Sequence, residues 1–266
     1  MKVSLPGGGL ELAYEESGSG TPVLFVHGWP HNRTLWSGQL SGLATHARCI
    51  APDLRGFGGS TVRGPYTISQ YADDMIALLD ALHLERVVVV GLSMGGYIAF
   101  DLLRRHRGRV RALVLASTRA GADGGEARLK RERLIEFIEH RGIEALAEQQ
   151  LSAQLAATTR TSRPEVAEVL RRIMASASPE GAIGAQRAMI ARQDSTDLLR
   201  TIDVPTLVVG GAEDSIAPSE ELSAMAAAIP ASRLELIAAA AHVCAFEKPA
   251  AFDHLVGELL AGLLHD

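Results

Sequence analysis

The stretch Val87–Phe100, VVVVGLSMGGYIAF, places a single serine where an apolar run of strand length meets a helical pattern. A serine at a sharp turn from strand to helix adopts a strained backbone, and side chains two positions away on either side would collide with the turn. Gly91 and Gly95 occupy those two positions around Ser93. The pattern therefore predicts a serine hydroxyl above the carboxyl edge of a sheet, where open α/β folds place their sites.

The same stretch has a second interpretation that involves no chemistry. The glycines would then only allow close packing of helix on strand, and Ser93 would be a helix cap. We favour a nucleophile, because a helix N-terminus offers N–H groups and a dipole that stabilise a developing negative charge.

Short apolar runs recur along the chain and alternate with amphipathic segments. Nearly continuous apolar runs are typical of strands covered on both faces, and intervening helices imply a parallel sheet. The expected strands are residues 10–16, 22–27, 47–52, 86–91, 112–117, 206–211 and 233–238, and the expected helices are 34–44, 68–82, 95–105, 219–228 and 249–264. The fold class is therefore α/β, with helices on both faces of the sheet.

One region interrupts this alternation. From about Gly121 to Asp194 the chain contains only stretches with helical periodicity, and two of them begin with a proline that suits a first helical turn. We interpret residues 120–195 as a helical cap, or lid, inserted into a core formed by residues 1–119 and 196–266. The alternative is that these helices pack on the core as ordinary crossovers.

Composition limits the classes of protein to consider. Of the 266 residues, 47% are hydrophobic and 21% are charged, which is the balance of a soluble globular protein. The formal charge of −5 comes with no basic stripe, so neither nucleic acid nor an anionic membrane is an expected partner. The first residues lack a signal-peptide core and no apolar run has the length of a membrane span, so we expect a cytoplasmic protein. Cys49 and Cys244 form no disulfide framework or metal-binding pattern.

A serine hydroxyl is a poor nucleophile, so it needs a base, and the base needs an orienting carboxylate. His242 follows the last expected strand, and Asp214 follows the preceding one, so both belong at the same edge as Ser93. The histidines set aside are five at polar faces or ends of helices, together with one that has no evident partner: His83, His106, His140, His254, His265 and His46.

The order Ser93, Asp214, His242 resembles that of the α/β-hydrolase superfamily. The matching motifs span nearly the whole chain: HGWP from residue 27, DLRGFGGS from 53, GLSMGG from 91, GGAEDSIAP from 210 and AHVCAFEKP from 241. The chain is similar to the branch of carboxylesterases, 3-oxoadipate enol-lactonases and arylesterase or perhydrolase enzymes. The resemblance implies an eight-stranded, mostly parallel sheet, a helical cap after the sixth strand, and no cofactor.

The resemblance also implies roles for individual residues. Ser93 would be the nucleophile, His242 the general base and acid, and Asp214 the group that holds the imidazole tautomer. The main-chain N–H groups of Trp29 and Met94 would form the oxyanion hole.

The HGWP motif would support that hole. Gly28 would let the loop pass close to the site, and His27 would hold the loop by hydrogen bonds. The alternative is an ordinary turn with a core tryptophan at Trp29. A metal site formed by His27 and His31 is disfavoured, because the two lie in a loop that contains a proline.

Two details depart from the family pattern or leave a choice open. Ala241 stands where a glycine often precedes the histidine, and an alanine would be strained there if a positive φ were required. Glu213 adjoins Asp214 and is the alternative acid, although the spacing of DSIAP favours Asp214. Cys244 is interpreted as a packing residue.

Other activities can be weighed on single residues. Haloalkane dehalogenases and epoxide hydrolases share the fold but have an aspartate at the strand-to-helix turn, where this chain has Ser93. Hydrolysis of an alkyl halide or an epoxide is therefore disfavoured. Dinucleotide binding by GFGGST would need a third glycine where Thr61 stands. We therefore expect an enzyme, a serine hydrolase that cleaves a small to medium carboxylic ester or lactone through an acyl-enzyme. The alternatives are a carbon–carbon bond hydrolase of ring-cleavage products and a receptor-like ligand-binding protein with a slow triad; a homodimer is possible.

Overall fold

Eight short strands form one sheet in the described part of the chain, as the family resemblance implies, and seven of them correspond to the apolar runs. The computed structural model describes residues 1–6 and 9–264, so residues 7, 8, 265 and 266 of the predicted core, including His265, lie outside the described residues. The strands are β1 Lys2–Ser4, β2 Glu11–Ser17, β3 Thr21–Val26, β4 Ala47–Pro52, β5 Val87–Leu92, β6 Val110–Ala116, β7 Thr206–Gly211 and β8 Ser232–Ile237. Strand β1 is too short to leave a hydrophobic pattern, which is why no run in the sequence indicated it.

The order of the strands fixes where a site can lie. The sheet runs β1-β2-β4-β3-β5-β6-β7-β8, with β2 antiparallel to both of its neighbours and the strands from β4 to β8 parallel. The chain moves outward from β3 to β4 and then returns to the other side of β3 with β5. The carboxyl ends of β3 and β5 therefore flank the point where the strand order reverses, and open α/β sheets bind ligands at such points.

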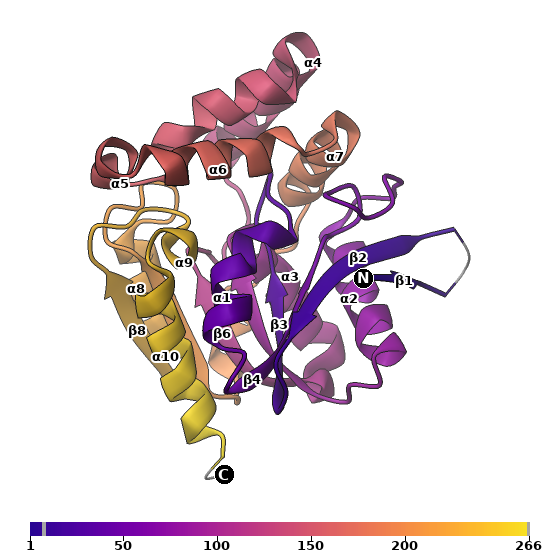
Figure 1. Cartoon of the computed structure of the whole chain (residues 1–266), viewed down its shortest axis with the longest axis vertical. Coiled ribbons are helices and arrows are strands. Elements are labelled where there is room, and N and C mark those ends of the chain that lie inside the picture. Colours follow the sequence, from indigo (N-terminus) through magenta and orange to yellow (C-terminus); the bar gives the residue numbers. More distant parts are fainter. Residues whose placement is uncertain (7–8, 265–266) are drawn as a thin grey trace.

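Helices cover both faces of the sheet because alternate strand residues point to opposite sides. In β5, Val87 and Val89 pack in one apolar cluster, and Val88 and Val90 pack in the other. The first cluster is covered by α2 Ile68–Ala81, α3 Met94–His106 and α8 Ser219–Ala228, and the second by α1 Ser37–Gly42 and α10 Pro249–Gly262 (Figure 1).

The predicted helix over residues 34–44 is divided in the structure. It begins as the 3₁₀ helix η1 Arg33–Trp36 and continues as α1. Asn32 accounts for the early start, because its side chain accepts a hydrogen bond from the Thr34 N–H and caps η1. The remaining short helices are η2 Arg107–Arg109, η3 Leu199–Thr201 and α9 Cys244–Glu247.

Four α-helices, followed by η3, lie between β6 and β7 with no strand among them. They are α4 Gly125–Gln154, α5 Ala157–Ser162, α6 Pro164–Ala175 and α7 Pro179–Ile190, and they lie together beyond one end of the sheet (Figure 1). Gly142 has φ 81° and ψ 172°, so α4 is two helical pieces joined at a kink. Pro164 and Pro179 occupy first-turn positions, as their spacing predicts.

No helix within residues 1–6 and 9–264 combines the length and the apolar character needed to cross a lipid bilayer.

Candidate active site

Ser93 lies on the turn between β5 and α3, and its backbone is strained. It has φ 53° and ψ −111°. A Cβ on Gly91 would lie 2.5 Å from the Gly95 carbonyl oxygen, and a Cβ on Gly95 would lie 2.2 Å from the Val26 carbonyl oxygen. Both glycines are therefore required by the space around the turn. The Ser93 N–H donates to the Ala116 oxygen at 2.9 Å, which holds the turn against β6.

His242 and Asp214 meet at the same end of the sheet. The Nδ1 atom of His242 lies 2.9 Å from Oδ2 of Asp214, and both residues are buried. The other carboxylate oxygen, Oδ1, accepts the N–H groups of Ile216 at 2.8 Å and Ala217 at 3.0 Å. Although burial raises the pKa of Asp214, the adjacent His242 and these hydrogen bonds outweigh it and hold that pKa below its ordinary value.

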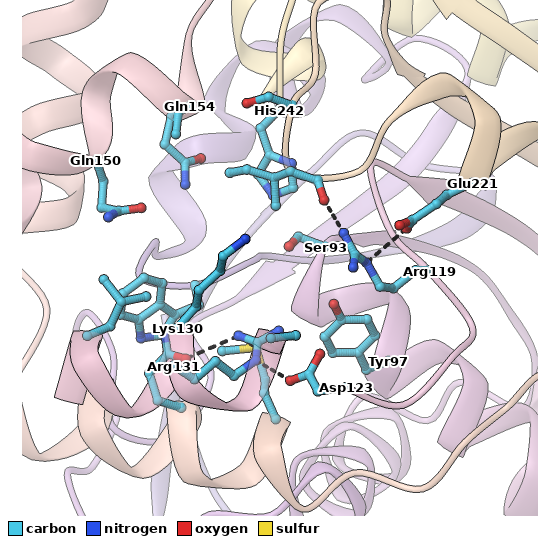
Figure 2. Close-up of a pocket in the computed structure, with 18 of the residues that line it drawn as sticks. Ser93, Tyr97, Arg119, Asp123, Lys130, Arg131, Gln150, Gln154, Glu221 and His242 are labelled. Carbon is cyan, nitrogen blue, oxygen red and sulfur yellow. Dashed lines mark hydrogen bonds and ion pairs between the residues drawn. The ribbon is translucent and has the colours of Figure 1, made fainter. Parts of the chain in front are cut away.

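One pocket of about 400 Å³ contains both Ser93 and His242 in its wall. Figure 2 shows Ser93 and His242 on the same side of this space, with side chains from the helices of residues 120–195 opposite them. The structure therefore brings the three residues Ser93, Asp214 and His242 to one edge of the sheet, as their order in the chain predicts.

The loop after β3 passes directly against the serine. A Cβ on Gly28 would lie 3.2 Å from the Ser93 Cβ and 3.1 Å from the Leu92 oxygen, so any larger residue would press on the serine turn. The indole of Trp29 lines the pocket and donates its Nε1–H to the Ala182 oxygen of α7 at 3.0 Å. Met94 begins α3 immediately after the serine. The residues that carry the two expected oxyanion amides thus lie on the loop and the helix adjoining Ser93.

His27 is engaged on both ring nitrogens. Nδ1 lies 2.8 Å from the Gly28 oxygen, and Nε2 is 3.0 Å from the N–H of Leu54, which donates to it. Burial lowers the pKa of His27. A neutral ring with a proton on Nδ1 satisfies both contacts, so His27 joins the loops that follow β3 and β4.

His31 is also buried, but its surroundings are different. Among the described residues, no group forms a hydrogen bond with either of its ring nitrogens. Burial, with smaller contributions from His27 and His242, lowers the pKa of His31 well below its usual value. Within those same ranges, no group of three or more His, Cys, Asp or Glu side chains could hold a metal ion.

The structure also bears on the two open details of the sequence. The left-handed residue in the histidine loop is Ala239, with φ 50°, and Ala241 does not have a positive φ. Glu213 is exposed, whereas Asp214 contacts His242. Cys244 is buried without a disulfide, and burial raises the pKa of its thiol to about 12.

Several polar side chains that line the pocket were not identified from the sequence. Arg119 pairs with Glu221 at 3.1 Å and donates to the Ile216 oxygen, and Arg131 pairs with Asp123 (Figure 2). Lys130, Gln150 and Gln154 also line the pocket, and all three come from α4. A sequence pattern marks such residues as ordinary polar positions of a helix, and only the placement of α4 turns them toward Ser93.

Glu247 is a further residue that sequence reasoning left without a role. It is fully buried, and its carboxylate accepts the N–H groups of Ala241 at 2.6 Å and Ala156 at 3.0 Å. The available signal was a charged residue five positions after His242 in AHVCAFEKP, but its burial comes from tertiary contacts alone.

Comparisons with known proteins agree with this geometry. The family described as alpha/beta hydrolase fold matches residues 21–249. A thermophilic esterase from Thermogutta terrifontis, solved with malate bound, is 40% identical, with a TM-score of 0.95 over 99% of both chains. An enol-lactonase structure from Burkholderia xenovorans is 28% identical, with a TM-score of 0.90 over 98% of this chain and 100% of that one. The 3-oxoadipate enol-lactonase 2 of Acinetobacter baylyi is 30% identical over 88% of this chain and 86% of its own length.

Since the family match covers most of the chain and the sheet has the expected eight strands, mostly parallel, the chain belongs to the α/β-hydrolase family.

Proposed function

We propose that the chain is a serine hydrolase of carboxylic esters and lactones. The observation that carries this proposal is the hydrogen bond between His242 and Asp214 in the wall of the pocket that also exposes Ser93. A strained serine at a helix N-terminus, beside an imidazole held by a carboxylate, is an arrangement suited to acyl transfer.

Acylation would begin with attack of the Ser93 hydroxyl oxygen on the substrate carbonyl. The hydroxyl proton passes to Nε2 of His242, because Nδ1 carries the proton that is donated to Asp214. The carbonyl oxygen becomes an oxyanion that the N–H groups of Trp29 and Met94 stabilise. When the intermediate collapses, the bond to the leaving alkoxide breaks, and His242 returns the proton to that oxygen.

Deacylation would use the same groups with water as the nucleophile. His242 takes a proton from the water as it attacks the acyl-enzyme, and Ser93 leaves with that proton. The products are a carboxylic acid and the free enzyme. With a lactone, the alcohol and the acid stay joined in one hydroxy acid, so no separate alcohol is released.

The pocket and the relatives support a small to medium substrate. A pocket of about 400 Å³ is near the lower end of the usual range for small-molecule sites, roughly 300–1,000 Å³. The structural relatives named above are an esterase and an enol-lactonase, which favours ester and lactone bonds over carbon–carbon bonds.

We also propose that residues 120–195 act as a lid over the core of residues 1–119 and 196–266. Helices α4 and α7 supply side chains to the pocket wall opposite Ser93. In this division the core carries the triad, and the lid shapes the space for the acyl and alcohol groups.

Turnover of p-nitrophenyl esters of increasing chain length, with lactones alongside, tests the proposal. We expect steady release from the native chain, and loss of release in Ser93→Ala with unchanged circular dichroism. Ser41→Ala is the matched control, because Ser41 is exposed on α1. An active Ser93→Ala variant, or a native chain that turns over none of these esters and lactones, would refute the proposed function.

A further inference from the structure

The loop that carries His242 is bonded to the segment of residues 154–156 on both sides of the histidine. On one side, the Val243 N–H donates to the main-chain oxygen of Gln154 at 3.2 Å. On the other side, the Ala241 N–H donates to Oε1 of Glu247 at 2.6 Å. Oε2 of the same carboxylate accepts the Ala156 N–H at 3.0 Å. The segment 154–156 therefore reaches one flank of His242 directly and the other through Glu247.

Glu247 is well suited to this bridging role. Its two oxygens face two main-chain donors from different parts of the chain, and none of the residue is exposed. The main-chain oxygen of Glu247 also accepts Nη2 of Arg163 at 3.0 Å, from the start of α6. The residue is thus held to the lid by both its side chain and its backbone.

The position of His242 depends on these contacts because Asp214 fixes only one ring nitrogen. The main chain on each side of the histidine sets the position of its side chain. Residue 243 is bonded to the segment 154–156 directly, and residue 241 is bonded to it through Glu247. A misplacement of about 1 Å in a catalytic group can cost on the order of 100-fold in rate. The Gln154 side chain lines the pocket near His242 (Figure 2), so this segment contacts both the substrate space and the histidine loop.

We propose that Glu247 is a positioning residue that couples the seating of the lid to the placement of His242. This inference rests on the proposed hydrolase function for its kinetic consequences, but not for its structural ones. Glu247 acts through the backbone before His242, without touching the substrate.

Glu247→Gln tests the bridge with little change of shape. A glutamine keeps one acceptor oxygen but turns an NH₂ group toward the other main-chain N–H, so either the Ala241 or the Ala156 bond is lost. We expect kcat for p-nitrophenyl acetate to fall by about 10- to 100-fold, with KM changed less than about threefold. The matched control is Asp74→Asn, which removes a buried carboxylate paired with Arg55 outside the pocket. It should lower Tm and leave kcat unchanged.

Ala156→Pro removes the lid donor without touching Glu247. Ala156 has φ −55° and Leu155 has φ −118° and ψ 140°, values that suit a proline and the residue before it. We expect a lower kcat than in Ala156→Gly, which keeps the N–H. Because both changes break the same bridge, Ala156→Pro should add little in the Glu247→Gln background.

A readout independent of turnover separates this inference from the proposed function. The Nδ1 proton of His242, shared with Asp214, should give a low-field NMR signal that Asp214→Asn removes. We expect Glu247→Gln to shift or broaden this signal, and Asp74→Asn to leave it in place. The inference is overturned if Glu247→Gln keeps both kcat and the signal. It is also overturned if Glu247→Gln and Asp74→Asn lose kcat alike, each in proportion to its fall in Tm. A native chain without esterase activity would refute the function, and the signal alone would then decide the role of Glu247.

Discussion

Asp214→Asn should trap the imidazole of His242 in the wrong tautomer. The carboxylate receives two main-chain N–H groups on Oδ1, from Ile216 and Ala217, and faces His242 with Oδ2. In the variant, these two donors will hold the amide oxygen at the Oδ1 position. The NH₂ group then points at Nδ1 of His242 and requires it to be an acceptor. The ring proton moves to Nε2, which can no longer accept the proton of Ser93.

The size of the effect follows from the same contacts. Turning the amide over restores the productive tautomer but breaks two hydrogen bonds, at about 1 to 1.5 kcal/mol each. That cost of about 2 to 3 kcal/mol corresponds to roughly 30- to 140-fold in rate at about 1.4 kcal/mol per tenfold. Loss of the charge beside the imidazolium adds to it, so the total fall in kcat should be about 10³ to 10⁴, as for the same change in serine proteases.

The assay is steady-state hydrolysis of p-nitrophenyl acetate at pH 7.5, with urea unfolding to show that the variant is folded. Glu213→Gln is the control, because Glu213 is the exposed neighbour of Asp214 and should retain full activity. A folded Asp214→Asn variant that retains a tenth of the native kcat would refute the tautomer reasoning. A large loss in Glu213→Gln would show that the wrong acid has been assigned.

Two further predictions concern stability. Gly95→Ala would place a Cβ 2.2 Å from the Val26 oxygen, so the free energy of unfolding measured in urea should fall by about 1 to 3 kcal/mol. Gly108→Ala is the control, because nothing lies within 4 Å of its new Cβ. Equal stabilities of the two variants would contradict the packing argument. Burial lowers the pKa values of His27 and His31, so below about pH 6.5 the unfolded chain binds protons that the folded chain excludes. The free energy of unfolding should therefore decrease as the pH is lowered, by up to about 1.4 kcal/mol per pH unit for each histidine. His31→Leu should reduce this slope between pH 6.5 and 5, and an unchanged slope would show that His31 is not neutral in the folded state.

The parts of the fold that repeat a strong local pattern could be predicted from the sequence. The helix expected over residues 219–228 has those bounds in the structure, and the continuous apolar runs correspond to the seven strands from β2 to β8. Strand β1 has three residues and α5 has six, which is too short for a periodic signal. The helical patterns of residues 126–140 and 142–157 are separate in the sequence, and they correspond to the two pieces of α4 that meet at Gly142.

The candidate site divides in the same way. Ser93, Asp214 and His242 each follow a strand, so the topology of a parallel sheet is enough to bring them to one edge. Glu247 and the lid side chains have no such constraint. Their positions depend on how α4 to α7 rest on the core, and side-chain packing between separate elements leaves no periodic mark in the sequence.

The proposed triad and the proposed lid are joined by hydrogen bonds, and these bonds should limit how the lid sequence can change among related chains. Ser93 is held by the core, through the Ala116 oxygen and the Thr118 hydroxyl, which donates to the Ser93 oxygen at 2.7 Å. In contrast, the loop with Trp29 is bonded to Ala182 of α7, and the loop with His242 is bonded to residues 154–156. The proposed nucleophile is therefore placed by the sheet, whereas the proposed base and one proposed oxyanion donor are placed partly by the helices of residues 120–195. A lid sequence that reshapes the pocket must preserve these hydrogen bonds, so specificity has more freedom to change along the middle of α4 than at residues 154–156 or at the start of α7.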